Sequence, residues 1–312
     1  MNFKYLDLYN YLLSTFDEGE NDEGLYADEI AYLDDFLKSV LDEDVGEGDI
    51  TTDCCVPESA VSNGVFIAKE PGVICGLGIL KRIFTILDES LFFKPLIRDG
   101  DMVAKGDVVA KISGSSRTIL TGERTALNLL QHMSGIATKT AEAVREVSGT
   151  KTRILDTRKT TPGFRALDKY AVKCGGGNNH RFNLADGVII KDNHIKAAGG
   201  ITNAVKKVYG ITQTETVSQP VHRHYPIEVE TETLAQVDEA LNAGADIIML
   251  DNMTPEIMAE AVRLINGRAL TEASGNMGER NLKEIADTGV DFISIGALTH
   301  SVKALDISLR FE

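Results

Sequence analysis

The chain has 312 residues, 43% of them hydrophobic, and its 47 Asp/Glu outnumber its 32 Lys/Arg to give a formal net charge of −15. This length is enough for two globular domains, while the acidic balance argues against a nucleic-acid partner. No apolar run has the length of a membrane span, and the start of the chain does not read as a secretory signal. The four cysteines have no metal-ligand spacing and suggest reduced thiols. We therefore expect a cytoplasmic protein without a membrane partner.

The acidic residues are concentrated at the start of the chain. Residues 1–53 contain sixteen Asp/Glu and two Lys. Within them, residues 1–27 predict an acidic N-terminal extension. A solvated surface segment is the simpler interpretation, and a regulatory arm is the alternative. Residues 28–44 place apolar side chains at helical spacing and predict the first helix of the folded part.

Residues 61–112 are rich in short strand-like runs and turns. Strands are predicted at 61–67 and 72–75 and within 99–112. The last of these resembles half of a lipoyl or biotinyl carrier domain. A second half with a modifiable lysine at its tip is missing, so the likeness concerns architecture. A non-catalytic carrier or binding module remains an alternative, which the intact mass of the purified protein would distinguish. Residues 122–147 predict a long helix.

After residue 153, apolar strands alternate with helical segments, which predicts a parallel α/β barrel. Six strands are expected, fewer than the eight of a closed barrel, at residues 153–157, 187–191, 226–230, 247–251, 269–276 and 292–297. Each ends in a cation, a carboxylate, a hydroxyl or a glycine, and active sites of such barrels lie at the carboxyl ends of the strands. Residues 306–311 alternate like an edge strand that returns to the N-terminal domain.

A cationic stretch interrupts this acidic chain. Residues 151–196 contain ten Lys/Arg against four Asp/Glu. A local excess of positive charge in a cleft attracts anions, so this stretch predicts an anion-binding site.

A series of motifs occurs in order along the chain: Gly122–Asn128, Asp156–Gly163, Lys169–Val172, Cys174–Arg181, Lys191–His194, Ile227–Glu230, Leu250–Asn252, Ser274–Asn276 and Gly296–His300. Together they are highly specific, and they resemble the motifs of the quinolinate phosphoribosyltransferase family, the decarboxylating enzymes of NAD synthesis. The resemblance runs from about Leu41 to Phe311.

The resemblance implies an α/β fold with an N-terminal α/β sandwich and an open, incomplete barrel of the type II phosphoribosyltransferase kind. We expect the sandwich at residues 28–135, with 303–312 returning to it, and the barrel at 136–302. The implied reaction joins quinolinate to phosphoribosyl pyrophosphate with Mg²⁺ and yields nicotinate mononucleotide, pyrophosphate and CO₂. A homodimer with shared active sites, or a higher oligomer, is implied as well.

Quinolinate is a planar dicarboxylate, which suits the two-pronged hydrogen bonding of arginine. The resemblance implies a set of contacts to it: Arg124 from the neighbouring subunit, Thr157, Arg158, Lys159, His180, Arg181 and Lys191. Taken alone, Arg124 would be read as a surface residue in a helix.

Phosphoribosyl pyrophosphate is the second substrate. Its predicted contacts are Lys159, Lys191, Glu230, Asp251, Ser274, Gly275, Asn276, Gly296 and His300. Glu230 and Asp251 suit Mg²⁺, directly or through water, and with Lys159 and Lys191 they are the predicted catalytic residues. Helix capping is the simpler role for the two acids.

Two further alternatives are open. One lysine of this site, Lys159 or Lys191, could form a Schiff base with a carbonyl substrate. The chain could also be a phosphoribosyltransferase-like relative encoded with molybdate transporters. The intact Asn179-His180-Arg181 and Lys191–His194 motifs favour the quinolinate enzyme.

Overall fold

The computed structural model describes residues 27–212 and 225–312. Most of the predicted acidic extension, residues 1–26, lies outside them. Packing divides the chain into two compact units that interleave along the sequence. The first contains the described residues up to Glu142, with Thr160–Gly176 and Ser301–Glu312, and the second contains Ala143–Lys159 and Gly177–His300. The sequence pattern placed the boundary between residues 135 and 136, with residues 303–312 returning to the N-terminal domain, and did not assign Thr160–Gly176 to that domain.

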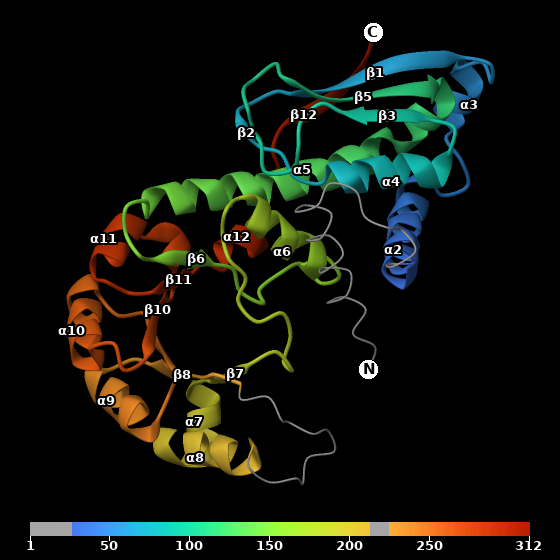
Figure 1. The fold of residues 1–312 in the computed structure, drawn as a ribbon. Helices are drawn as coiled ribbons and strands as arrows, with labels where there is room; N and C mark the ends of the chain where they lie inside the picture. Colours follow the sequence, from blue (N-terminus) through green and yellow to red (C-terminus); the bar gives the residue numbers. More distant parts are fainter. Residues whose placement is uncertain (1–26, 213–224) are drawn as a thin grey trace. The chain divides into compact units, whose positions relative to one another are not determined.

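The first unit has an antiparallel sheet in the order β12-β1-β5-β3, a small pair β2-β4, and helices (Figure 1). The strands are β1 (Val61–Ala68), β2 (Gly72–Val73), β3 (Phe92–Pro95), β4 (Met102–Val103), β5 (Val108–Ser115) and β12 (Ile307–Phe311). The helices are α2 (Ala27–Val45), α3 (Ile50–Cys55), α4 (Leu77–Leu87), α5 (Ser116–Glu146, whose last turn belongs to the second unit) and α6 (Arg165–Cys174).

The predicted C-terminal strand is confirmed. β12 pairs antiparallel with β1, with Phe66 opposite Leu309. The helix expected at residues 28–44 is α2, which buries Leu33, Leu37 and Leu41 along one face. Strand β1 packs on the apolar face of α4, where the rings of Phe66 and Phe84 lie 6.1 Å apart.

Helix α5 begins at Ser116, six residues before the start predicted at Gly122, and this glycine lies inside the helix. A Cβ at Gly122 would lie 2.6 Å from Cδ1 of Leu87. A Cβ at Gly135 would collide with the carbonyl oxygen of Lys303, where the C-terminal segment crosses the helix. These glycines permit close approach, which outweighs their low helix propensity.

Helix α6 lies between two barrel strands in the sequence, yet it packs with the first unit. Its buried Asp168 accepts a 2.7 Å hydrogen bond from Nε2 of His132 on α5. The ring of Phe164, just before α6, meets His132 and Phe36 edge to face, with ring centres 5.5 Å apart in each case. These contacts explain why a segment from the middle of the chain belongs to this unit.

The second unit is a parallel sheet of six strands within the described residues, in the order β6-β11-β10-β9-β8-β7. They are β6 (Arg153–Leu155), β7 (Val188–Ile190), β8 (Ile227–Thr231), β9 (Ile247–Asp251), β10 (Leu270–Ser274) and β11 (Phe292–Ser294). All six were predicted from the sequence. Among the residues described, β6 and β7 are the two ends of this order, so the sheet is open, as expected.

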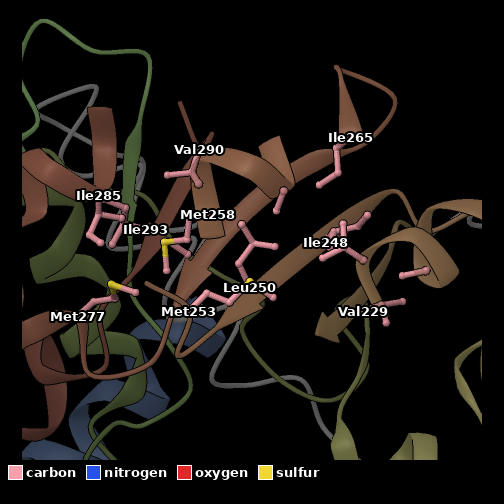
Figure 2. Packing of buried hydrophobic residues seen from close by; sticks show 14 of the residues in the cluster. Val229, Ile248, Leu250, Met253, Met258, Ile265, Met277, Ile285, Val290 and Ile293 are labelled. Carbon is pink, nitrogen blue, oxygen red and sulfur yellow. The ribbon is translucent and has the colours of Figure 1, made fainter. Parts of the chain in front are cut away.

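Helices line the outer side of this curved sheet (Figure 1). They are α7 (Asp192–Ala198), α8 (Ile201–Thr212), α9 (Leu234–Ala243), α10 (Pro255–Ile265) and α11 (Leu282–Asp287), followed after β11 by the short α12 (Ala297–His300); a 3-10 turn, η1 (Met277–Glu279), follows β10. Figure 2 shows the core between the two layers: Ile248 and Leu250 of β9 lie among side chains that include Met258 and Ile265 of α10. The apolar faces of helices and strands thus hold the strand ends in place.

Candidate active site

The carboxyl ends of parallel strands meet at one edge of a sheet. The strand order therefore sets the order of the predicted site residues along that edge. Lys159 follows β6, and Gly296 follows its neighbour β11. Next come Ser274 at the end of β10, Asp251 at the end of β9 and Glu230 near the end of β8, while Lys191 directly follows β7.

Lys159, Gly296 and His300 lie together. A Cβ at Gly296 would lie 3.1 Å from Cδ of Lys159 and 3.1 Å from Cδ2 of His300. Buried Thr299 donates a 2.8 Å hydrogen bond from its hydroxyl to the carbonyl of Lys159, which ties α12 to the loop after β6. Thr157, in the same loop, accepts a 3.0 Å hydrogen bond from the backbone N–H of Lys159. Gly296 therefore allows Lys159 and His300 to lie close against the backbone at this point.

Asn252 after β9, and Gly275 and Asn276 after β10, adopt left-handed conformations. Gly275 has φ +94°, and Asn252 and Asn276 have φ 54° and 52°. The backbone N–H of Asn252 donates to the carbonyl of Ser274 at 3.0 Å. A Cβ at Gly275 would collide with the side chain of Asn252. Turns of this kind expose backbone N–H groups that suit phosphate oxygens.

Lys191 and Glu230 form an ion pair, with 2.8 Å between Nζ and Oε2. Burial and the charge of Glu230 raise the pKa of Asp251, while a hydrogen bond from Asn252 and the charges of Lys191 and Lys159 lower it. The net effect is a raised pKa. Two carboxylates therefore lie close enough to repel each other, beside two lysines.

Asp156 organises the loop that carries the Asn-His-Arg motif. It is fully buried at the end of β6. Its carboxylate accepts hydrogen bonds from the backbone N–H of His180 at 2.8 Å and from the side chain of Asn179 at 2.5 Å. Asn178 pairs beside Leu155 as an isolated parallel bridge. This loop therefore extends the sheet edge on the far side of β6 from β11.

Arg181 lies beside Arg158. Burial and the charge of Arg158 lower the pKa of the Arg181 guanidinium. One of its terminal nitrogens donates to the carbonyl of Gly187 at 3.0 Å. Its Nε is buried and has no hydrogen-bond partner among the described residues. Two neighbouring guanidinium groups, one with an unmet donor, are suited to binding a carboxylate anion.

His180 is partly buried and lies between two buried glutamates that were not predicted as site residues. Its Nε2 lies 3.1 Å from Glu228 of β8 and 3.4 Å from Glu272 of β10, and their side chains are 3% and 2% exposed. Burial lowers the pKa of His180, but the two carboxylates outweigh it and raise that pKa to about 10. Burial and the charge of Glu272 raise the pKa of Glu228.

The hydrogen bond at the other ring nitrogen places the protons of this cluster. Nδ1 of His180 accepts from the backbone N–H of Arg181 at 2.7 Å, so Nε2, which faces the two carboxylates, carries the ring hydrogen. The raised pKa of His180 means that this cluster retains a proton above neutral pH. In such a coupled group, a pKa belongs to the cluster rather than to one residue.

The second unit thus brings together every predicted site residue except Arg124, which is exposed on α5 in the first unit. Sequence reasoning missed Asp156, Thr299, Glu228 and Glu272 as part of the site. For the two glutamates, the available signal was an acid within a short apolar strand, where a buried charge requires a partner.

Both parts of the chain match profiles of one protein family. The family profiles described as "Quinolinate phosphoribosyl transferase, N-terminal domain" and "Quinolinate phosphoribosyl transferase, C-terminal domain" match residues 49–134 and 136–310. The first match includes residues 61–112, so these residues match the N-terminal domain of this family, which argues against a carrier module.

Relatives match over most of their length. The chain is 46% identical over 277 residues to the "Probable nicotinate-nucleotide pyrophosphorylase [carboxylating]" of Bacillus subtilis, covering 88% of this chain and 92% of that protein. It is 44% identical to the "Quinolinate phosphoribosyltransferase [decarboxylating] 1b" of Nicotiana tabacum, covering 88% and 81%. The solved nicotinate-nucleotide pyrophosphorylase of Francisella tularensis superposes with a TM-score of 0.84 at 39% identity, covering 91% and 97%.

Proposed function

The chain belongs to the quinolinate phosphoribosyl transferase family, and we infer from this that it catalyses the decarboxylating transfer of a phosphoribosyl group to quinolinate in NAD biosynthesis. The products are nicotinate mononucleotide, pyrophosphate and CO₂. The enzyme is a pentosyltransferase. The two alternatives, a carrier module and a molybdate-associated relative, lack support from the family matches.

The observation that carries this proposal is the pair Arg158 and Arg181. The two guanidinium groups lie close enough to lower the pKa of Arg181, and the buried Nε of Arg181 has no partner within the described chain. A carboxylate of quinolinate would supply that partner and separate the two positive charges. Thr157 and Lys159 lie in the same loop as Arg158 and complete this side of the predicted site.

Phosphoribosyl pyrophosphate would bind along the rest of the strand edge. The turn at Ser274–Asn276 and the glycine at Gly296 would hold the 5′-phosphate through backbone N–H groups. Lys159 and His300, which meet at Gly296, are suited to the leaving pyrophosphate.

Glu230 and Asp251 fit a magnesium site. Both offer carboxylate oxygens, the donors that Mg²⁺ prefers, and their mutual repulsion would be relieved by a divalent cation. They would hold the ion directly or through water, near the ribose hydroxyls. When bound, Mg²⁺ supplies positive charge to the diphosphate.

The residues act by charge and position. The pyridine nitrogen attacks the anomeric carbon as pyrophosphate leaves, and the positive charge that develops on the ribose is offset by Glu230 and Asp251. Lys159, Lys191 and His300 stabilise the negative charge of the leaving group. Ribosylation makes the ring nitrogen cationic, which allows the adjacent carboxylate to depart as CO₂. The electron pair of the broken bond stays on the ring carbon, which then takes up a proton from water. Lys191 lies in an ion pair with Glu230, which favours a role in anion binding over a Schiff base.

We also propose a cytoplasmic homodimer or higher oligomer in which Arg124 reaches the active site of the neighbouring subunit. Its exposure on α5 supports this role. The four cysteines, all within the described part of the chain, are free thiols, as suits a reducing compartment. In the described residues, no helix has the length and apolarity that crossing a bilayer requires.

One coupled assay tests the reaction. The purified protein is supplied with quinolinate, phosphoribosyl pyrophosphate and Mg²⁺, and pyrophosphate and CO₂ are followed together. We expect equal amounts of both products, and the same assay with nicotinate serves as the control. Absence of product from quinolinate under these conditions would refute the proposal.

A further inference from the structure

The cluster of His180, Glu228 and Glu272 has no role in the reaction as described so far. The two glutamates come from β8 and β10, alternate strands of the sheet, and both carboxylates reach the same ring nitrogen, at 3.1 and 3.4 Å. Each also has one oxygen, Oε1, that is buried and without a hydrogen-bond partner in the described residues. Buried carboxylates with unmet acceptors are rare in stable cores, so this arrangement requires an explanation.

A metal ion is one explanation, since a histidine and two carboxylates lie within ligand distance of one another. The hydrogen bond at Nδ1 argues against it. Because Nδ1 accepts from the N–H of Arg181, the ring hydrogen resides on Nε2, the nitrogen that faces both carboxylates. A metal at Nε2 would have to displace that hydrogen and leave an imidazolate. The hydrogen-bonded cluster is the simpler state.

The cluster is connected directly to Arg181. Nδ1 of His180 accepts a hydrogen bond from the backbone N–H of Arg181. The carbonyl of Gly187 accepts one from a terminal guanidinium nitrogen of Arg181 at 3.0 Å. The arginine is thus fixed at both ends, with its buried Nε left for an anion. Since both ring nitrogens of His180 already contact protein groups, the ring is placed to support Arg181.

We propose that Glu228 and Glu272 are positioning residues for quinolinate: through His180 they fix Arg181 in the orientation that receives a substrate carboxylate. The inference rests on the proposed function, and it assigns His180 a supporting role in place of the direct contact expected from the family resemblance. Glu228 and Glu272 do not touch the substrate.

The test compares Michaelis constants for the two substrates. Glu272→Ala removes one acceptor of the Nε2 hydrogen, and we expect the KM for quinolinate to rise by about tenfold while that for phosphoribosyl pyrophosphate stays within about twofold. Glu272→Gln retains an acceptor oxygen and should recover most of the loss. The double variant Glu228→Gln with Glu272→Gln should raise the KM for quinolinate by more than the product of the single effects. The reason is that both carboxylates face the same Nε2 hydrogen of His180.

Thr271→Val is the matched control. Thr271 is the buried neighbour of Glu272 on β10, and its side chain binds Asp291, just before β11, rather than the cluster around His180. It should lower the melting temperature without changing either KM. If Glu272→Ala changes both KM values equally, or only lowers stability like the control, the positioning role is wrong. If the wild-type protein does not use quinolinate, the proposed function fails instead.

A measurement on the unmodified protein covers the case in which the variants do not fold. The chain has six histidines, and ¹⁵N labelling of their rings reports which nitrogen carries hydrogen. We expect the His180 signals to show Nε2–H with an unprotonated Nδ1 at pH 7.5, with His180→Gln used for assignment. A doubly protonated ring, or the opposite tautomer, would overturn the link to Arg181.

Discussion

Nζ of Lys191 lies 2.8 Å from Oε2 of Glu230, so a lysine that follows β7 and a glutamate of β8 form an ion pair at the edge where the predicted substrates meet. Each residue therefore influences the other. A substitution at Glu230 also releases Lys191, and its effect on catalysis cannot be assigned to a magnesium ligand alone.

Asp251→Asn is for this reason the better probe of the metal and phosphoribosyl side. Its carboxylate has a hydrogen bond to Asn252 at 2.8 Å, which the amide can largely retain, while the charge is lost. We expect a loss of kcat of about 100-fold, weaker dependence on Mg²⁺, and nearly normal quinolinate binding by calorimetry. A selective loss of quinolinate binding would contradict the assignment.

Nicotinate should be a very poor substrate. With one carboxylate fewer than quinolinate, it leaves the buried Nε of Arg181 without a partner next to Arg158. Sites built around a buried polar contact reject analogues that lack it by about 10⁴-fold. Competition assays with both substrates measure the ratio of kcat/KM directly. Comparable turnover of the two would show that this cationic pair does not select the substrate.

Arg124→Ala should abolish activity without affecting folding or dimer formation, if Arg124 serves the neighbouring subunit. Mixing this variant with Arg158→Ala then gives a clean test. Each mixed dimer has one site with both defects and one with neither, and half the dimers are mixed. Activity should return to about a quarter of wild type, from the statistics of random exchange between symmetric subunits. No recovery after demonstrated exchange would place each site within a single chain.

Gly275→Ala should impair both stability and phosphate binding. Its φ of +94° is strained for alanine, and the new methyl group would collide with the side chain of Asn252. We expect about 2–3 kcal/mol of lost unfolding free energy and a raised KM for phosphoribosyl pyrophosphate. Gly267→Ala is the control, since Gly267 has φ +73° with no described atom within 4 Å of the added carbon. It should lose only about 1 kcal/mol, with KM unchanged.

Stability should fall as the pH rises above neutrality. The folded cluster around His180 has a pKa of about 10, whereas a histidine in an unfolded chain has a pKa of about 6.5. Between these values the folded protein holds a proton that the unfolded chain has lost, so its contribution is complete below about pH 6.5 and disappears through pH 10. Urea unfolding at pH 7, 8.5 and 10 should show a smaller decrease for His180→Gln than for wild type. Parallel decreases would indicate other groups.

Much of the architecture was predictable from the sequence because it depends on local patterns. Apolar runs ending in a polar residue located all six barrel strands, and the polar ends located Lys191 and Asp251. The start of the long helix at Ser116 was not predicted: the helix was expected from residue 122, whereas Gly122 lies inside it, against Leu87.

The roles of Glu228 and Glu272 depend on a distant residue. Alternation along a strand shows that an acid lies on one face, but it does not say whether that face is solvated. Only the loop held by Asp156 brings His180 between the two acids. Likewise, the contact between Asp168 and His132, which keeps α6 with the first unit, joins residues that no local pattern relates.

The pairing of β12 with β1 has a consequence for biosynthesis. Residues 307–311 are synthesised long after β1 at residues 61–68, yet they pair with it and cover its edge of the sheet. At a synthesis rate of about 5–20 residues per second, the nascent chain carries this unpaired edge for more than about ten seconds. A polypeptide that terminates early therefore exposes a strand ready to pair with another chain.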